Sequence, residues 1–125
     1  MASLVEALNV QDKYLAGKGK LFINNAWVDA RSGATLDVFD PATGDAIAKV
    51  AAADREDVDD AVRAARAAFD GGKWSQLTPS VRGQLLWKVA ELLERDYDTF
   101  CTLETIDNGK PLALSRGDVT LAIDM

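Results

Sequence analysis

The 125-residue sequence contains no histidine and only one cysteine, Cys101. The absence of histidine removes the commonest general base, the Ser-His and Cys-His nucleophile systems and most zinc sites from this chain. A single cysteine gives no disulfide framework, which favours a reducing compartment and makes the cytoplasm the expected location. Cys101 has apolar neighbours and no adjacent base, so we expect an inert packing residue and not a nucleophile.

The sequence also lacks an excess of basic residues and a long apolar run. Its 14 Lys and Arg are scattered among 20 Asp and Glu, for a formal net charge of −6. That charge opposes binding to the phosphates of nucleic acids and of anionic membranes. No apolar stretch approaches the ~20 residues of a membrane span, and the N-terminus has no pattern of a secretory signal. We therefore expect no nucleic-acid partner, no membrane partner and no secretion.

What the sequence does contain is the composition of a globular protein, with 48% hydrophobic and 27% charged residues. After a lead-in over residues 1–19, alternation with a period of two predicts an antiparallel strand meander over residues 20–53. Its strands are expected at 21–23, 26–28, 35–39 and 46–51. Asn24-Asn25 suits the positive φ of a type I′ hairpin turn. We expect Trp27 and Phe39 to pack in the core or between elements, and not to serve as ligand platforms.

Residues 54–125 have the apolar period of helices. Asp54 predicts the N-cap of a first helix, which carries an alanine-rich apolar face and ends at Gly71-Gly72. Asp57, Asp59 and Asp60 on this helix lack the glycine-containing loop of a calcium site, so we expect them to form a solvated face.

A second helix is predicted to begin at Thr78-Pro79, an N-cap followed by a proline in the first turn. It carries a broad apolar stripe: Leu85, Leu86, Val89, Leu92 and Leu93. A bend is expected near residues 96–98, where Asp98 can cap a third helix. That helix is expected to stop at the corner Asp107–Pro111. In this corner the glycine accepts positive φ, the lysine complements the negative end of the helix dipole and the proline opposes continuation of the helix.

A last helix is predicted after Pro111. Ser115 and Asp118 have the spacing of a capping box, with Asp in place of the usual Glu. An apolar stripe then begins with Val119, Ala122 and Ile123. The stripe stops at Met125 without a cap, so we interpret the chain as a piece of a longer protein.

Three linked segments resemble the aldehyde dehydrogenase superfamily. The segment Glu104–Pro111 reads Glu-Thr-Ile-Asp-Asn-Gly-Lys-Pro and is similar to a helix-terminal signature of that family. Phe22–Trp27 resembles its opening hairpin, and Asp40–Asp45 followed by Asp54–Val62 resembles its next turn and first helix. The resemblance covers about residues 20–125 and implies roughly the opening quarter of such an enzyme.

The resemblance implies an α/β fold, namely the N-terminal segment of an aldehyde dehydrogenase. In that segment a small antiparallel strand meander is followed by three to four helices, here residues 54–125, that pack on a Rossmann-like domain absent from this chain. The implied partners are the remainder of the same polypeptide and, for the full-length protein, a homodimer or homotetramer.

The activity implied by the resemblance is oxidation of a small aldehyde to a carboxylic acid with NAD or NADP. A cysteine thiolate attacks the aldehyde, hydride passes to the nicotinamide, and a glutamate activates the hydrolytic water. We expect no catalytic and no cofactor-binding residue in this chain, because the nucleophile lies far downstream of Glu104–Pro111 in the family and no Gly-x-Gly-x-x-Gly motif occurs here. The chain alone is expected to be inactive.

Two sets of residues receive roles from the resemblance. Family members hold a monovalent cation through an aspartate and a backbone carbonyl, which places Asp107 and Phe39 as ligands. The alternative is that Asp107 only hydrogen-bonds the corner. In the family, the helix after the signature lines the substrate tunnel. In this chain Asp118, Leu121 and Ala122 share one side of that helix, so the resemblance implies that they line the tunnel. Leucine and alanine favour an apolar or aromatic aldehyde, and packing in the core is the alternative.

A non-catalytic helical interaction module is the competing hypothesis for the whole chain. It explains the lack of catalytic groups equally well. Continuation of the reading frame past Met125 into a family-like sequence favours the enzyme, whereas a stop codon there favours the module. Within the superfamily, a CoA-acylating or semialdehyde-specific member stays open.

Overall fold

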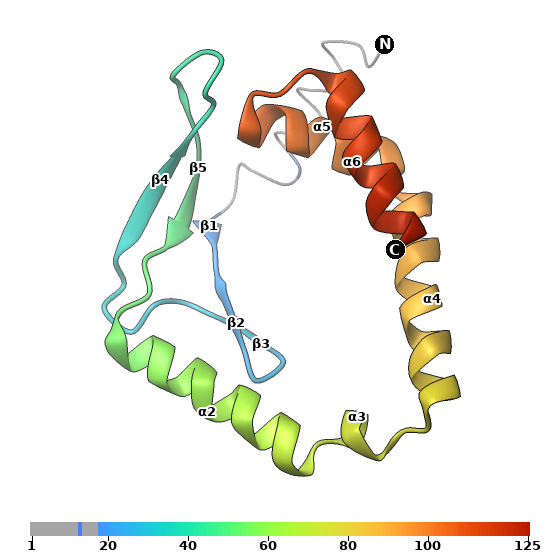
Figure 1. Ribbon diagram of the computed structural model, residues 1–125. Helices are drawn as coiled ribbons and strands as arrows, with labels where there is room; N and C mark the ends of the chain where they lie inside the picture. Colours follow the sequence, from blue (N-terminus) through green and yellow to red (C-terminus); the bar gives the residue numbers. More distant parts are fainter. Residues whose placement is uncertain (1–12, 14–17) are drawn as a thin grey trace.

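The computed structural model describes Lys13 and residues 18–125, with the strands first and the helices after them (Figure 1). The strands are β1 (Lys18–Gly19), β2 (Leu21–Ile23), β3 (Ala26–Val28), β4 (Thr35–Phe39) and β5 (Ala46–Ala51). The helices are α2 (Arg55–Gly71), α3 (Lys73–Gln76), α4 (Pro79–Arg95), α5 (Tyr97–Asn108) and α6 (Leu112–Asp124). This order confirms the predicted α/β class. Apart from Lys13 and β1, the predicted lead-in lies outside the described residues.

The strands form two small sheets and not one continuous meander. β2 and β3 pair antiparallel through the predicted turn, in which Asn24 and Asn25 have φ of 50° and 61°. β4 and β5 also pair antiparallel, and β1 adds to β5 in parallel, giving the order β1-β5-β4. The meander prediction differs here because the chain after β3 is drawn to a helix: the Arg31 N–H donates to the Asp57 carboxylate of α2 at 3.2 Å.

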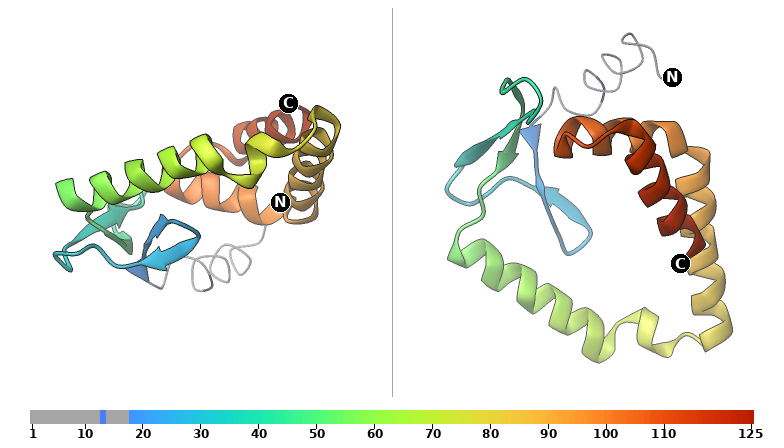
Figure 2. Two further views of the ribbon diagram at one scale, coloured as in Figure 1. Left: turned by 90° about the horizontal axis from the view of Figure 1, so that it is seen from below. Right: turned by 45° about the horizontal axis from the view of Figure 1, so that its top comes forward.

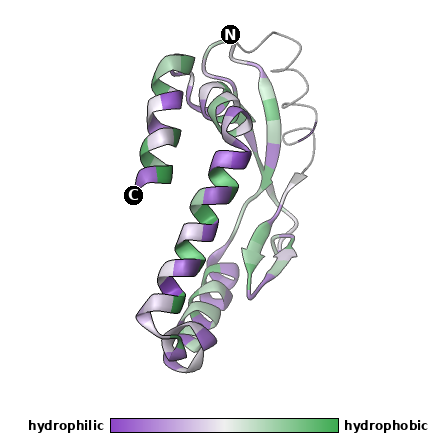
Figure 3. Ribbon diagram, turned by 90° about the vertical axis from the view of Figure 1, so that its right-hand side faces the viewer, coloured by the Kyte–Doolittle hydropathy of each residue, from purple (hydrophilic) through white to green (hydrophobic). Residues whose placement is uncertain are grey.

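The elements follow one another around an open frame (Figures 1 and 2). Few side chains of the described residues are fully buried in it. The sheets and α2 make one part of the frame, and α4, α5 and α6 make the other. Among the described residues, the buried hydrophobic side chains are Ala30, Ile47, Cys101 and Val119. Figure 3 shows apolar residues alternating with hydrophilic ones along the helices. The predicted apolar stripes are therefore present, but much of their surface is uncovered within this chain.

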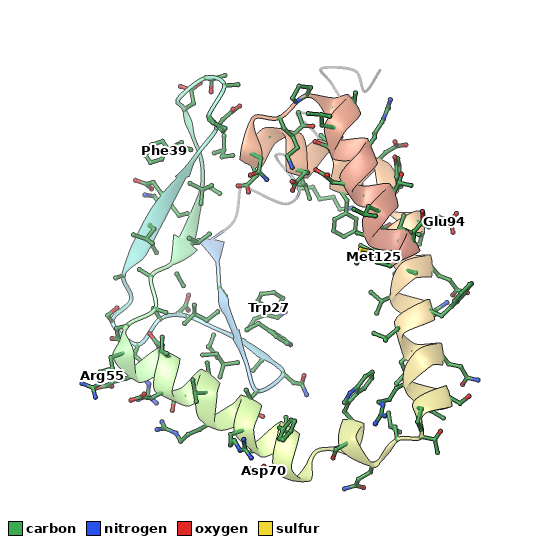
Figure 4. The ribbon with its side chains drawn as sticks, in the orientation of Figure 1. Trp27, Phe39, Arg55, Asp70, Glu94 and Met125 are labelled. Atoms are coloured by element: carbon green, nitrogen blue, oxygen red, sulfur yellow. The ribbon has the colours of Figure 1, made fainter. Side chains whose placement is uncertain are left out.

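The two strand aromatics are exposed, contrary to the expectation that they pack. Trp27 is 68% exposed and Phe39 is 56% exposed. Trp27 stacks on Phe22 with ring centroids 4.9 Å apart, and it projects from the β2–β3 hairpin toward the middle of the frame (Figure 4). Phe39 projects from β4 away from the middle of the frame (Figure 4). Both side chains are thus more than half exposed among residues 18–125 and are not packed in a core there.

Helix starts follow the predicted caps, with one correction. Asp54 caps α2 and forms a capping box with Asp57, and Thr78 caps α4 ahead of Pro79. The bend between α4 and α5 occurs as expected, but Asp96 occupies the cap position and Asp98 lies in the first turn of α5. The predicted cap lies two residues too late, because α4 ends at Arg95 and leaves a single residue, Asp96, between the helices.

Asp57 also corrects the expected solvated face of α2. It is only 3% exposed, and its carboxylate accepts the backbone N–H groups of Arg31 and Asp54. Asp60 binds the guanidinium groups of Arg31 and Arg63, which lower the pKa of its carboxyl. These two aspartates tie the loop after β3 to the start of α2, which periodicity alone does not reveal.

Candidate functional site

The corner Asp107–Pro111 is built by a left-handed glycine that lies against the β4–β5 turn. Gly109 has φ of 68°, and its N–H donates to the Thr105 carbonyl at 2.9 Å, closing α5 as predicted. A Cβ at this position would lie 2.7 Å from Cγ of Pro41. Glycine is therefore required at position 109 for two reasons, namely its left-handed backbone conformation and the close approach of the β4–β5 turn.

That approach brings the two predicted cation ligands to one region of the frame. Phe39 ends β4 directly before the turn that contains Pro41, and Asp107 lies in the last turn of α5. The β4–β5 turn lies beside the end of α5 (Figure 1). Asp107 is exposed, and within residues 18–125 no group donates a hydrogen bond to its carboxylate. In the same part of the chain, no three His, Cys, Asp or Glu side chains cluster as a metal site. A carboxylate and a backbone carbonyl are nevertheless the oxygen donors that suit a hard cation.

Lys110 connects the two helices that meet at the corner. Its ammonium donates to Glu104 Oε1 of α5 at 2.6 Å and to Asp118 Oδ2 of α6 at 2.7 Å. The hydrogen bonds from the ammonium to Asp118 and to Glu104 raise the pKa of Lys110. The lysine therefore stays protonated and links a carboxylate on each helix.

Neutral hydrogen bonds join α5 to α6 as well. The hydroxyls of Thr105 and Ser115 lie 2.9 Å apart, and the Tyr97 hydroxyl donates to the Arg116 carbonyl at 3.0 Å. Ser115 is fully buried inside α6, so the predicted capping box is wrong. The helix already begins at Leu112 after Pro111, whose fixed φ suits a helix start, and Ser115 turns to Thr105 instead.

Cys101 lies in the same packed region. It is 1% exposed, and burial raises the pKa of its thiol. A buried thiol with a raised pKa is a poor nucleophile, because the thiolate is the reactive form. The expectation of a packing residue agrees with this burial.

A pocket of about 240 Å³ opens where α4, α5 and α6 meet, and we call it the corner pocket. Its lining residues are Leu93, Phe100, Glu104, Asp118, Val119 and Ala122. Of the three predicted tunnel residues, Asp118 and Ala122 therefore line this pocket. Leu121 does not line it, and at 58% exposure it is not packed in a core within this chain either.

Sequence reasoning missed the α4 and α5 walls of the corner pocket. Phe100 and Glu104 are four residues apart and share one face of α5, which is a readable signal. Leu93 belongs to the apolar stripe of α4 and carries no signal of its own. The pairing of these faces depends on how the helices cross, which the stripe does not specify.

Comparison with protein-family models shows which family the chain resembles over most of its length. The model described as the aldehyde dehydrogenase family matches residues 27–125. The chain belongs to the aldehyde dehydrogenase family. The matched region contains the corner, the corner pocket, β4, β5 and part of β3, so the resemblance extends over the sequence between the short segments from Trp27 onward.

Curated aldehyde dehydrogenases and solved structures agree with the family model. The chain is 53% identical over 97 residues to the mitochondrial aldehyde dehydrogenase of Sus scrofa, covering 77% of this chain and 19% of the relative. It is 54% identical over 95 residues to cytosolic aldehyde dehydrogenase 1 of Macroscelides proboscideus, covering 75% of this chain and 19% of the relative.

The NAD+ complex of an aldehyde dehydrogenase from Bacillus cereus aligns with a TM-score of 0.85 and 38% identity, covering 90% of this chain and 23% of that one. The chain thus spans about a fifth of the length of the curated relatives, and it has the fold of an N-terminal aldehyde dehydrogenase segment.

A second pocket, of about 550 Å³, lies between the β2–β3 hairpin and α2. The charged side chains that line it include Arg31, Asp57, Asp60 and Arg63, whose pairing is described above. In this aldehyde dehydrogenase segment Asp60 pairs with the guanidinium groups of Arg31 and Arg63, and Asp57 accepts backbone N–H groups, so these residues stabilise the junction. Of the helices in Lys13 and residues 18–125, none combines the length and the apolar character needed to cross a bilayer.

Proposed function

We propose that this chain is the N-terminal part of an NAD(P)-dependent aldehyde dehydrogenase that oxidises an aldehyde to a carboxylic acid. The observation that carries the proposal is the family match over residues 27–125, which includes the corner and the corner pocket. Use of NAD or NADP is supported by the Bacillus cereus relative, which was solved with NAD+. The full-length protein is proposed to act in the cytoplasm as a homodimer or homotetramer.

The described part of the chain is proposed to line part of the substrate path and to hold α6 in place, while the reacting groups come from the remainder of the polypeptide. Cys101 is buried and its pKa is raised, which fits packing and not attack on an aldehyde. The dinucleotide, when bound by the remainder, supplies the hydride acceptor. The nucleophilic cysteine and the glutamate base are assigned to that remainder too, so the 125-residue chain alone is proposed to be inactive.

The contribution of this chain to substrate binding is assigned to α6. Asp118, Leu121 and Ala122 are proposed to line the path of the aldehyde. Asp118 and Ala122 face the corner pocket, and Leu121 presents an exposed apolar side chain from the same helix. Walls with leucine, alanine and Phe100 favour an aldehyde with an apolar or aromatic body.

A monovalent cation is proposed to bind the Asp107 carboxylate and the Phe39 carbonyl. The chain fits this assignment because Asp107 has no competing partner within residues 18–125 and because Pro41, two residues after Phe39, lies against Gly109. The cation would join the β4–β5 turn to the end of α5 and so stabilise the corner from which α6 begins.

The test uses the full-length enzyme, meaning the polypeptide encoded by the reading frame that runs through and beyond Met125. Purified full-length enzyme and the 125-residue chain are each given NAD or NADP and a panel of aliphatic and aromatic aldehydes, and reduced nicotinamide is measured. We expect turnover by the full-length enzyme and none by the chain. A folded full-length protein without activity, or a stop codon after Met125, would support the interaction module instead.

A further inference from the structure

The corner pocket combines an apolar lining with two carboxylates that share one lysine. Leu93, Phe100, Val119 and Ala122 supply the apolar surface, and Glu104 and Asp118 supply the charge. The two carboxylates come from different helices, one from α5 and one from α6. Without a counter-ion between them, their repulsion would drive the two walls of the pocket apart.

Lys110 supplies that counter-ion from outside the lining of the pocket. It lies in the corner, six residues after Glu104 and eight before Asp118, and its ammonium reaches both at 2.6 and 2.7 Å. The side chains of Lys110 and Glu104 are 30% and 34% exposed, so this half of the bridge is partly shielded from solvent. Partial shielding strengthens the pair relative to the exposed ion pairs elsewhere on the helices.

We propose that Lys110 is a positioning residue for the aldehyde path: by holding Glu104 and Asp118 it fixes the spacing of α5 and α6 and limits the negative charge of the corner pocket. This inference rests on the proposed function. One ammonium for two carboxylates leaves the rim with a net negative charge. The pocket therefore accepts neutral or cationic aldehydes and disfavours anionic ones, and loss of Lys110 makes that preference stronger.

The experiment compares aldehydes that differ only in a carboxylate. The pairs are benzaldehyde with its para-carboxylate, and hexanal with its terminal carboxylate. For the full-length enzyme, kcat and KM are measured for each pair in Lys110→Met, Lys110→Arg and Asp118→Asn. Lys88→Met is the matched control, because Lys88 also bonds a carboxylate at 2.6 Å but lies on α4 away from the corner pocket.

We expect Lys110→Met to lower the ratio of kcat/KM for the anionic aldehyde over the neutral one by about threefold to tenfold, mainly through KM. The change should shrink at high ionic strength. Lys110→Arg should restore most of the ratio, Asp118→Asn should raise it, and Lys88→Met should leave it unchanged. Changes of opposite sign in this ratio for Lys110→Met and Asp118→Asn separate the charge effect from a simple loss of stability. A loss of stability would lower kcat/KM for both aldehydes together.

An unchanged ratio in Lys110→Met, in an enzyme that oxidises the neutral aldehydes, would overturn the positioning role and leave the proposed function intact. The same holds if Asp118→Asn and Lys110→Met change the ratio in one direction. Failure of the unsubstituted enzyme to oxidise any of the four aldehydes would instead overturn the proposed function and this inference with it.

Discussion

The helix pair α5–α6 and the two long helices α2 and α4 differ in how far their apolar faces are covered within this chain. In the corner, α6 covers α5, so that Cys101 and Val119 are buried and the polar groups between the helices bond one another. On α2 and α4, apolar side chains at helical spacing stay exposed, with Val62 at 61%. Equal periodicity therefore gives packed structure in one region only, because burial needs a second surface as well as a stripe.

The largest effect of the uncovered faces of α2 and α4 is expected in the 125-residue chain alone. Since α2 and α4 leave apolar faces uncovered, we expect this chain to be partly molten, to bind a hydrophobic dye and to self-associate. Thermal circular dichroism, dye fluorescence and size-exclusion chromatography provide the measurements. A monomer with a sharp two-state transition would contradict the contrast between the two regions.

Gly109→Ala should disrupt the packed region in the full-length enzyme. The added Cβ would meet Pro41 at 2.7 Å in a backbone with φ of 68°, so we expect a loss of about 2–3 kcal/mol in the free energy of unfolding. Gly117→Ala is the matched control, because no atom lies within 4 Å of its added Cβ. In the interior of α6, that change should stabilise by about 0.5–1 kcal/mol. Equal effects in a denaturant titration would refute the close approach.

Val62→Ala measures the covering of α2 in the full-length enzyme. If the remainder of the polypeptide packs on this face, the change should cost about 2 kcal/mol, as expected for Val119→Ala in the packed corner. The relevant exposures in this chain are 61% for Val62 and 8% for Val119. A cost below about 0.5 kcal/mol for Val62→Ala would show that the α2 face stays in solvent.

Leu121→Trp tests whether the exposed side of α6 faces the substrate. A larger side chain in the path should lower kcat/KM for a bulky aromatic aldehyde about tenfold more than for acetaldehyde. Steady-state kinetics of the full-length enzyme give the two values. Equal losses for both aldehydes, or no loss for either, would remove Leu121 from the path.

Asp107→Asn addresses the proposed cation at the corner. The change keeps an oxygen but removes its charge, so we expect about a tenfold weaker response of the melting temperature to K⁺ or Na⁺. Choline chloride at equal ionic strength is the control for general salt effects. A salt response that is the same in both proteins would leave Asp107 without a role as a ligand.

The sequence predicted more of the local structure than of the candidate site. The four predicted strands, the starts of α2 and α4, the Asn24-Asn25 turn and the Gly109 corner agree with expectation, whereas β1 and α3 were not predicted. For the site, the helix spacing placed Asp118 and Ala122 on a shared side, and both line the corner pocket. The same spacing included Leu121, which lies off the pocket, and it gave no indication of the opposite walls.

Sequence by itself determined the features that depend on residues within one turn of each other. Asp54 and Thr78 cap their helices, and Gly109 takes the left-handed conformation, because each acts on the backbone beside it. Family membership was also readable, because it rests on the order of local motifs.

Only the tertiary structure decided which distant groups meet. It pairs β1 with β5 in parallel, buries Asp57 under Arg31, turns Ser115 toward Thr105 and lets Lys110 join α5 to α6. None of these contacts follows from periodicity, since a stripe gives the direction of a face along its own element and not the element that will cover it.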